Sequence, residues 1–148
     1  MHNLIAHALV QNEKGEILII RRTMIKRGKQ NFEGGKWDIP GGTVEEMELP
    51  SEAAIRETKE EVGLDVNIEN ILYEKSNLDT KKQAVFTTLI YGCRTTGQLD
   101  INLDLEEHDD YKWLTSEEIL NMNDDELVSY MRETINNLKE KNNNEERK

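Results

Sequence analysis

Residues 50–62 carry a strong helix signal with identifiable start and stop residues. Pro50 suits a first helical turn, because the N–H that proline lacks would have no partner there. Residues 53–61 are mostly good helix formers, and Gly63 supplies the left-handed conformation that ends a helix, with Leu64 folding back onto the last turn. A short helix is therefore predicted here, and the rest of the chain must provide a surface for one of its faces.

The predicted helix has two chemically different faces. At about 100° per residue, one face carries a stripe suited to packing, formed by Ala54, Ile55, Thr58 and Val62. A different face gathers three acids, Glu57, Glu60 and Glu61. Like charges at this spacing repel by about 0.2–0.5 kcal/mol per pair, and two of the acids also face the negative end of the helix dipole. A divalent cation between the carboxylates would reverse the sign of the interaction.

The alternative interpretation is a solvated acidic face, since the chain has 30 acidic residues among 148. The spacing favours a specific site: Gly42 is followed after five residues by Glu48, and Glu48 after seven by the run RETKEEVGL. This pattern resembles the Nudix box, the signature of the Nudix hydrolases. The positions that match it in residue type are Gly42, Glu48, Arg56, Glu57, Glu60, Glu61 and Gly63. The preceding WDIPGG is similar to the usual approach to the box, whereas Thr58 stands where an aliphatic residue is commoner.

The resemblance implies an α/β fold, a Nudix-type α/β/α sandwich with a mixed central sheet and a catalytic loop-helix-loop. The strand patterns agree with this expectation. Segments 4–10 and 16–22 flank a turn that ends in glycine and predict a hairpin. Further strands are predicted at 65–75, 84–94 and 110–114, and the nearly continuous apolar run at 84–94 predicts a central strand. Pro40 and its neighbouring glycines are expected to stop any strand near residues 37–42.

Two helices are predicted after the last strand. Ser116 can cap a helix over 117–122, and 124–141 shows apolar side chains at helical spacing, with Asp124 and Asp125 in its first turn. A chain of 148 residues suits one domain rather than two. We expect a single domain over residues 1–140 and a polar, frayed tail over 141–148.

The resemblance also implies roles by position. Glu57, Glu60 and Glu61 are expected to hold Mg²⁺ or Mn²⁺ together with the backbone carbonyl of Gly41, and Glu57 to help deprotonate the attacking water. Hard oxygen ligands suit such a cation, which keeps several waters and binds substrate phosphate through its remaining positions.

Arg56 completes the implied catalytic set. It is expected to pair with Glu48 or Glu60 and so to orient the ligands, and the alternative for it is a plain surface ion pair. The motif positions expected to be structural are Gly42, Glu48 and Gly63.

One further acidic ligand is expected from the segment LDLEEHDDYKW. Glu107 is our choice, with Glu106, Asp109 and Asp110 as neighbouring acids, and a merely solvated acidic loop is the alternative. His108 is not expected to bind metal, because imidazole prefers softer cations. His7 lies in a strand pattern and remains unassigned.

A basic segment, residues 21–36, precedes the box. It holds six basic residues and one acid, so its net charge is +5. The remainder of the chain has a net charge of −16, and the whole chain −11. Such a loop can close over the phosphates of a small anionic substrate, and the alternative is a mobile insertion. The expected substrate-binding residues are Arg22, Lys26, Arg27, Lys36 and Gly42. Phe32 or Trp37 can stack on a base, although a tryptophan beside IP is more often in the core.

The function implied is Mg²⁺-dependent hydrolysis of a pyrophosphate bond in a nucleoside diphosphate linked to another group. The leading substrate is a nucleoside triphosphate, such as an oxidised purine nucleotide, cleaved to monophosphate and pyrophosphate. The chain has no proline or tyrosine some fifteen residues past the box, where members that hydrolyse ADP-ribose or diadenosine polyphosphates tend to carry one. The alternatives are another nucleotide derivative such as a nucleotide sugar or dinucleoside polyphosphate, an RNA 5′ end, or a catalytically silent nucleotide-binding module. The intact REXXEE argues against the last, since repelling acids serve no purpose without metal.

The charge and cysteine content bound the partners. A net charge of −11 argues against long nucleic acid and anionic membranes, which would repel the chain. The single cysteine, Cys93, excludes an internal disulfide and favours a reducing compartment. No long apolar run predicts a membrane span. We therefore expect a cytoplasmic protein with a small nucleotide as partner, as a monomer or a homodimer.

Overall fold

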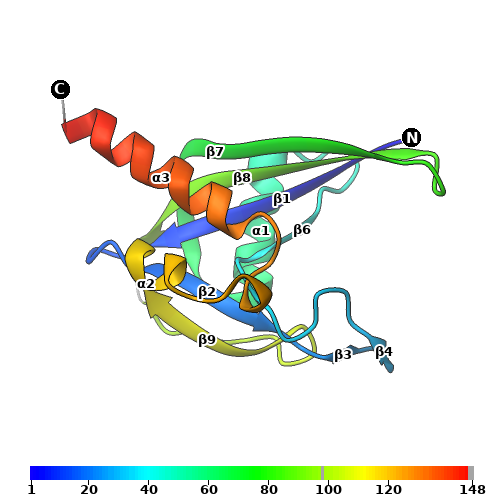
Figure 1. Cartoon of the computed structure of the whole chain (residues 1–148), viewed down its shortest axis with the longest axis horizontal. Helices are drawn as coiled ribbons and strands as arrows, with labels where there is room; N and C mark the ends of the chain where they lie inside the picture. Colours follow the sequence, from blue (N-terminus) through cyan, green and yellow to red (C-terminus); the bar gives the residue numbers. More distant parts are fainter. Residues whose placement is uncertain (98, 147–148) are drawn as a thin grey trace.

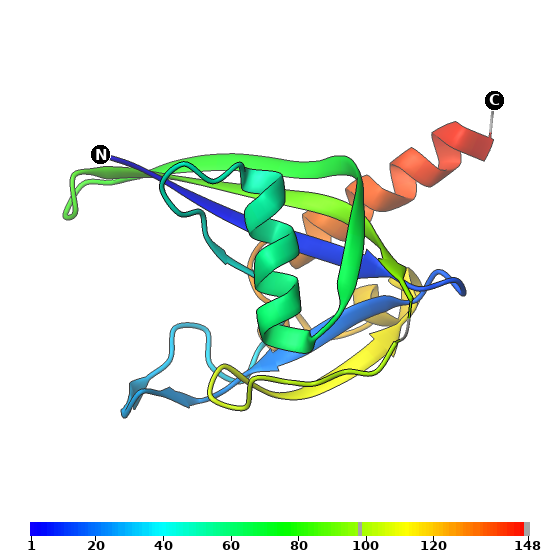
Figure 2. The ribbon, with the colours of Figure 1, turned by 180° about the vertical axis from the view of Figure 1, so that it is seen from behind.

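The computed structural model describes residues 1–97 and 99–146 and shows a mixed sheet between helices (Figure 1). Helix α1 covers one face of the sheet and α3 lies on the other, as the two opposite views show (Figures 1 and 2). The elements in chain order are β1 (His2–Gln11), β2 (Ile17–Arg22), β3 (Ile25–Lys26), β4 (Lys29–Gln30), β5 (Trp37–Asp38), β6 (Gly41–Thr43), α1 (Pro50–Val62), β7 (Asp65–Asp79), β8 (Ala84–Thr96), β9 (His108–Leu114), α2 (Ser116–Leu120), the 3₁₀ helix η1 (Asp124–Glu126) and α3 (Met131–Glu146). The predicted α/β sandwich is confirmed.

The main sheet has strand order β5-β2-β1-β8-β7, with β6 added to β1 and β9 to β2. β8 runs parallel to β1 and antiparallel to β7, so the segment predicted to be central does lie between two strands. β1 and β2 form the predicted hairpin but are paired only at Gln11 and Ile17. Beyond that pair they diverge, and β6 pairs with β1 while β5 pairs with β2. The sheet is therefore split between β1 and β2.

Two apolar cores form on the two faces of the sheet, because side chains alternate along each strand. On the α1 side, Ala6, Ala8 and Val10 of β1 pack with Ala53 and Ala54 of the helix. On the α3 side, the cluster includes Leu9, Ile17, Ile19, Trp37, Met131 and Ile135. Both faces are covered, which fits the near-continuous apolar runs of β1 and β2. None of the helices described over 1–97 and 99–146 has the length and apolar content to cross a membrane.

The last helix differs from the prediction at its start. Instead of one helix over 124–141, a 3₁₀ turn at 124–126 is followed by non-helical residues, and α3 begins at Met131. Leu127 is extended, with φ −114° and ψ 142°, and forms a parallel bridge with Trp37. The N–H of Val128 donates to the carbonyl of Trp37 at 3.0 Å. This pairing with β5 overrides the helical propensity of the segment.

Other local expectations were also wrong. The cap of α2 is Thr115, whose side chain accepts from the N–H of Glu118, and Ser116 is the first helical residue. Short strands β5 and β6 occur on either side of Pro40, where we expected none. α3 continues to Glu146 into the predicted tail, while residues 147 and 148 lie outside the described part of the chain.

Candidate active site

A cavity of about 740 Å³ lies where β1 and β2 separate. Its walls come from β1, the β5–β6 connection, α1, the basic segment, the loop before β9 and the residues before α3. The split in the sheet thus brings together parts of the chain that are far apart in sequence. Glu57, Glu61 and Glu107 line the cavity, together with Gly41 and Gly42.

The packing of helix α1 against the sheet determines where its acidic side chains lie. It spans Pro50–Val62 as predicted, and Gly63, at φ 78°, donates its N–H to the carbonyl of Lys59. Ala53, Ala54 and Val62 are fully buried against the sheet. Thr58 is also buried, and its hydroxyl donates to the carbonyl of Ala54 at 2.7 Å. A polar residue at this packed position therefore has its hydrogen bond satisfied within the helix.

The two helix faces do not divide as predicted. Ile55, expected in the packed stripe, is 37% exposed. Among the acids, Glu61 is only 6% exposed and Glu57 is partly buried, whereas Glu60 is exposed and is not part of the cavity wall. Residues four apart lie about 40° from each other around the axis, so Glu57 and Glu61 can share the cavity, while Glu60 turns to the other side of Glu57.

Glu61 is the most deeply buried of the acids on α1. Its Oε2 accepts a hydrogen bond from the N–H of Gly41 at 2.9 Å. Burial raises the pKa of Glu61 well above its usual range, the Gly41 hydrogen bond opposes this, and the charges of Glu57, Asp38 and Glu107 raise it further. The Gly41 peptide therefore lies directly beside a buried carboxyl that lacks a cationic partner in the described residues 1–97 and 99–146.

Glu57 lines the same cavity, but its carboxylate has a cationic neighbour, Arg56. Burial raises its pKa, and the neighbouring Arg56 partly opposes the rise by a hydrogen bond of 2.9 Å to Oε1. The backbone of Gly42 passes so close that a Cβ there would lie 2.6 Å from Cδ of Glu57. Gly42 is thus needed for space rather than for a special backbone conformation, and it leaves the carboxylate of Glu57 free to occupy the cavity.

Arg56 is the centre of an ion-pair cluster. Its Nε and one terminal nitrogen contact the two oxygens of Glu48 at 2.8 and 3.1 Å. The other terminal nitrogen contacts Glu57 at 2.9 Å and Glu60 at 3.3 Å. These contacts lower the pKa of Glu48 and raise that of Arg56. A fork-shaped pairing of this kind fixes the direction from which the guanidinium meets Glu57.

Glu107 reaches the cavity from the loop before β9. Its carboxylate pairs with Lys26 of the basic segment at 2.9 Å. The two segments are also joined by Thr23, whose N–H donates to the carbonyl of Glu107 at 3.1 Å. Of the other acids considered there, Asp109 instead pairs with Arg21 at 2.7 Å.

The basic segment forms a small hairpin, β3–β4, and lies partly over the cavity. Arg22, Lys26, Arg27 and Phe32 line the wall, whereas Lys36 does not. Phe32 is 79% exposed, so its ring is accessible at the mouth. Trp37 is 5% exposed and belongs to the core on the α3 side. Arg22 is not available as a simple phosphate ligand, because its guanidinium already contacts Asp38, Asn31 and the carbonyl of Phe32.

Three residues in the wall had no role assigned from the sequence. His7, Asp38 and Tyr130 come from β1, β5 and the segment before α3, and they contact one another. Asp38 lies within the quoted WDIPGG, but nothing in a single sequence indicates that Tyr130 meets it. An acid four positions before Gly42, the first matching position of the box, was the one available signal.

The carboxylate group suits a divalent cation. Over residues 1–97 and 99–146, no set of three or more His, Cys, Asp or Glu side chains is already close enough to hold a metal. Glu57 and Glu61 nevertheless line one cavity, both with raised pKa values, and Gly42 leaves room for the carboxylate of Glu57. A hard cation would compensate buried carboxylates and prefers such oxygens. The residues present therefore fit the metal that the motif implies.

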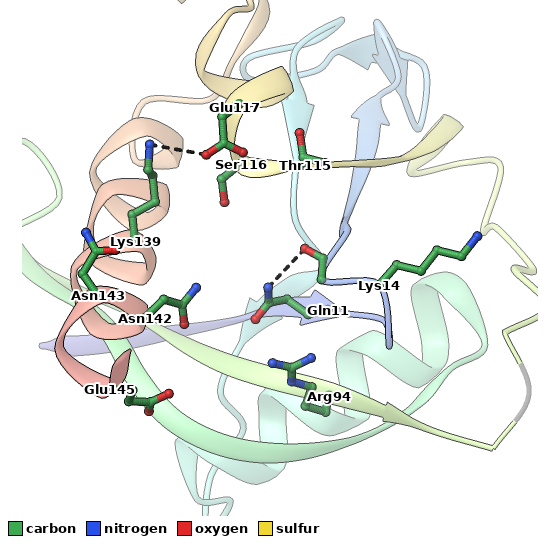
Figure 3. A pocket seen from close by; sticks show the side chains of 11 residues that line it. Gln11, Lys14, Arg94, Thr115, Ser116, Glu117, Lys139, Asn142, Asn143 and Glu145 are labelled. Atoms are coloured by element: carbon green, nitrogen blue, oxygen red, sulfur yellow. Dashed lines mark hydrogen bonds and ion pairs between the residues drawn. The ribbon is translucent and has the colours of Figure 1, made fainter. Parts of the chain in front are cut away.

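Another cavity, of about 610 Å³, lies between the β1–β2 turn, β8, α2 and α3 (Figure 3). Lys139 is directed to Glu117 there, and the side chain of Lys14 points away from the other labelled residues. Arg94 pairs with Glu69 at 3.1 Å. Because its cations are paired or point elsewhere and its walls lack the Nudix-box residues, the cavity between β1 and β2 is the better candidate.

His108 gives this site a testable pH dependence. It is 4% exposed, and its Nδ1 has no hydrogen-bond partner in the described part of the chain. Burial lowers its pKa to about 4, from 6.5. Between these two values the unfolded chain binds more protons than the folded one, so the stabilisation is complete above pH 6.5 and is lost as the pH falls towards 4.

The metal-free protein should therefore lose about 3 kcal/mol of unfolding free energy through His108 between pH 7 and pH 4. Urea unfolding of the wild type and His108→Gln at both pH values measures this loss. Glu57 and Glu61, whose pKa values are raised, act in the opposite direction in both proteins, so the difference isolates the histidine. Parallel pH profiles for the two proteins would contradict the burial of a neutral imidazole.

Comparison with known proteins identifies relatives of this chain. A family model described as NUDIX domain matches residues 1–138. A protein of Proteus vulgaris named 8-oxo-dGTP diphosphatase is 34% identical over 62 residues, which are 42% of this chain and 51% of that protein. A protein of Gluconobacter oxydans named RNA pyrophosphohydrolase is 31% identical over 131 residues, covering 76% of this chain and 71% of that one. The crystal structure of a MutT protein from Methanosarcina mazei Go1 matches with a TM-score of 0.75 at 28% identity, covering 95% of each chain.

Proposed function

The chain belongs to the NUDIX family, and on this basis we propose that it is a pyrophosphohydrolase that cleaves a nucleoside triphosphate to monophosphate and pyrophosphate with a divalent cation. The observation that carries the proposal is the meeting of Glu57, Glu61 and Glu107 with the basic segment in one cavity. Carboxylates alone would repel a polyphosphate, and basic residues alone would not activate water. Their juxtaposition supports phosphoryl chemistry on a small anion.

The residues that would hold Mg²⁺ or Mn²⁺ are Glu57, Glu60, Glu61 and Glu107, with the carbonyl of Gly41. Bound there, the cation supplies polarisation of a phosphoryl oxygen, a lowered pKa for water and neutralisation of the leaving phosphate. Glu60 is turned towards Arg56, so its participation requires a change of side-chain rotamer. Glu107 must likewise exchange Lys26 for the cation.

Glu57 is proposed to accept the proton of the attacking water. Its burial raises its pKa, which brings the carboxylate closer to the range where proton transfer is efficient at neutral pH. The water oxygen bonds to phosphorus as the anhydride P–O bond breaks, and the leaving phosphate departs with the bonding electrons. Arg56, fixed by Glu48, holds Glu57 in position. Lys26 and Arg27 line the cavity, and we propose that they bind the phosphates.

The choice of a nucleoside triphosphate rests on charge and on the cavity. The basic segment has a net charge of +5 in a chain whose net charge is −11, and such a short positive stretch suits a compact polyphosphate better than a long backbone. The name of the Proteus relative is consistent with this substrate. The name of the Gluconobacter relative favours a second candidate, an RNA 5′ end held by the same segment.

A substrate panel distinguishes these candidates. The purified protein with Mg²⁺ is offered nucleoside triphosphates including oxidised purines, nucleotide sugars, dinucleoside polyphosphates and a triphosphorylated RNA. We expect pyrophosphate release from a triphosphate, and its abolition by EDTA with recovery on adding Mg²⁺. Greater kcat/KM on the RNA would establish the second candidate. Absence of turnover on every substrate, combined with tight nucleotide binding by calorimetry, would instead indicate a silent binding module.

A further inference from the structure

A chain of hydrogen bonds runs from the start of α3 to the basic segment at the cavity mouth. We propose that Tyr130 is a positioning residue that acts through Asp38 and Arg22 to hold the end of this segment, with Phe32, over the cavity. The kinetic part of this proposal rests on the proposed function. The structural part, the restraint of the segment, does not.

The first link joins Tyr130 to Asp38. The phenolic hydroxyl donates to Oδ1 of Asp38 at 2.5 Å, and its oxygen lies 3.2 Å from Nε2 of His7. Asp38 is 1% exposed, so its carboxylate depends on protein partners rather than water. Oδ1 also accepts from the N–H of Ile39 at 2.7 Å. Burial raises the pKa of Tyr130, which keeps its hydroxyl protonated as a donor.

The second link joins Asp38 to Arg22. Oδ2 of Asp38 accepts from a terminal nitrogen of Arg22 at 3.1 Å. The pair is asymmetric, because the Asp38 side chain is 2% exposed and that of Arg22 is 24% exposed. With Oδ1 engaged by Tyr130 and the Ile39 backbone, Oδ2 is left to the guanidinium. The hydroxyl of Tyr130 therefore helps to set the orientation from which the carboxylate meets Arg22.

The third link joins Arg22 to the returning part of the basic segment. Nε donates to the carbonyl of Phe32 at 2.8 Å, and the second terminal nitrogen to the side chain of Asn31 at 3.2 Å. The backbone of Arg22 also bonds Lys36 and Gly35 at 2.9 and 2.8 Å. The three guanidinium nitrogens of Arg22 bond Asp38, Phe32 and Asn31. A change in the position of Asp38 would therefore also shift the hydrogen bond that holds the backbone of Phe32.

The local structure makes Tyr130 a clean test position. The segment before α3 is held to β5 independently, by the Val128 N–H to the Trp37 carbonyl. The Tyr130 ring also packs near His7 and Tyr73, with ring centroids 5.0 and 6.3 Å apart. Tyr130→Phe removes the hydroxyl and leaves these contacts. Tyr73→Phe is a matched control, because the Tyr73 hydroxyl makes no hydrogen bond among the residues described.

Hydrogen exchange of the metal-free protein measures the restraint directly. The relevant backbone amides are Asn31, Gly34 and Gly35, which bond to Met24, Asn31 and Arg22. We expect Tyr130→Phe to raise their exchange rates by about tenfold, the size typical of losing one hydrogen bond to a charged group. Amides of β8 should keep their rates in both variants, and Tyr73→Phe should resemble the wild type throughout.

Asn31→Ala provides a second variant, which removes one of the two Arg22 contacts of the last link and leaves the buried pair untouched. It should loosen the same amides while Tyr130 and Asp38 stay in place. With a substrate from the panel, both variants should raise KM several-fold and change kcat little, since the segment binds substrate but does no chemistry. If these amides exchange at the wild-type rate in Tyr130→Phe, the proposal is overturned. Faster exchange without any change in KM would retain the restraint and overturn its link to substrate binding.

Discussion

Replacing Glu57 with glutamine should lower kcat by roughly 10²–10⁴-fold, the usual contribution of a positioned general base. The amide keeps the size of the side chain but cannot accept the proton of water at neutral pH. The free energy of unfolding should change by no more than about 1 kcal/mol. Loss of the Arg56 contact is offset by removal of a partly buried charge whose pKa the fold raises.

Two comparisons sharpen this result. Glu46→Gln removes an exposed acid just before the same helix and should leave kcat unchanged. Glu61→Gln should also lose activity, and it should raise the thermal midpoint. The pKa of Glu61 is raised in the folded state, so the carboxyl group lowers the stability of the fold at pH values above its unfolded-state pKa, and an amide removes that effect. Steady-state kinetics and thermal unfolding measure the two effects. Unchanged phosphate release in both carboxamide variants would contradict the assignment of this site.

Helix α1 was predictable because its signals are local. Pro50 and Gly63 mark the first and last turns, and the structure places the helix at Pro50–Val62. Its exposure pattern was less predictable. The spacing grouped the three acids, but the angle between α1 and the sheet decides that Glu61 is buried while Glu60 faces solvent. That angle depends on the contacts of α1 with β1 and β7, and these contacts cannot be inferred from the residue periodicity of one helix.

The segment before α3 shows the same limit in another form. Leu127 and Tyr130 have helical spacing relative to Ile135 and Leu138, so the pattern alone predicts one continuous helix. The backbone instead pairs with Trp37, a partner 90 positions earlier, and the gain from that pairing exceeds the local preference. Tyr130 reaches the cavity only because the helix does not start before it. A tertiary contact therefore brings Tyr130 to the cavity, whereas the sequence pattern predicted only a residue within a continuous helix.

Gly42→Ala is expected to reduce kcat by about 10²-fold through displacement of Glu57, because a shift of about 1 Å in a reacting group has effects of this size. The added Cβ would lie 2.6 Å from Cδ of Glu57 and 2.8 and 2.9 Å from its oxygens. Because these atoms end a flexible side chain, the carboxylate should move rather than the backbone. The thermal midpoint should therefore fall only slightly.

A double-mutant cycle tests whether this loss acts through Glu57. If the methyl group only displaces that carboxylate, Gly42→Ala combined with Glu57→Gln should be no slower than Glu57→Gln alone. Additive losses would mean that the substitution acts other than through Glu57, either by misfolding or by hindering the approach of substrate phosphate to the backbone, and the thermal midpoint distinguishes these two. The cycle also separates displacement from misfolding, since misfolding would lower kcat by the same factor in either background. If the double variant and Glu57→Gln have the same kcat, glycine is required at position 42 because it leaves space for the carboxylate of Glu57.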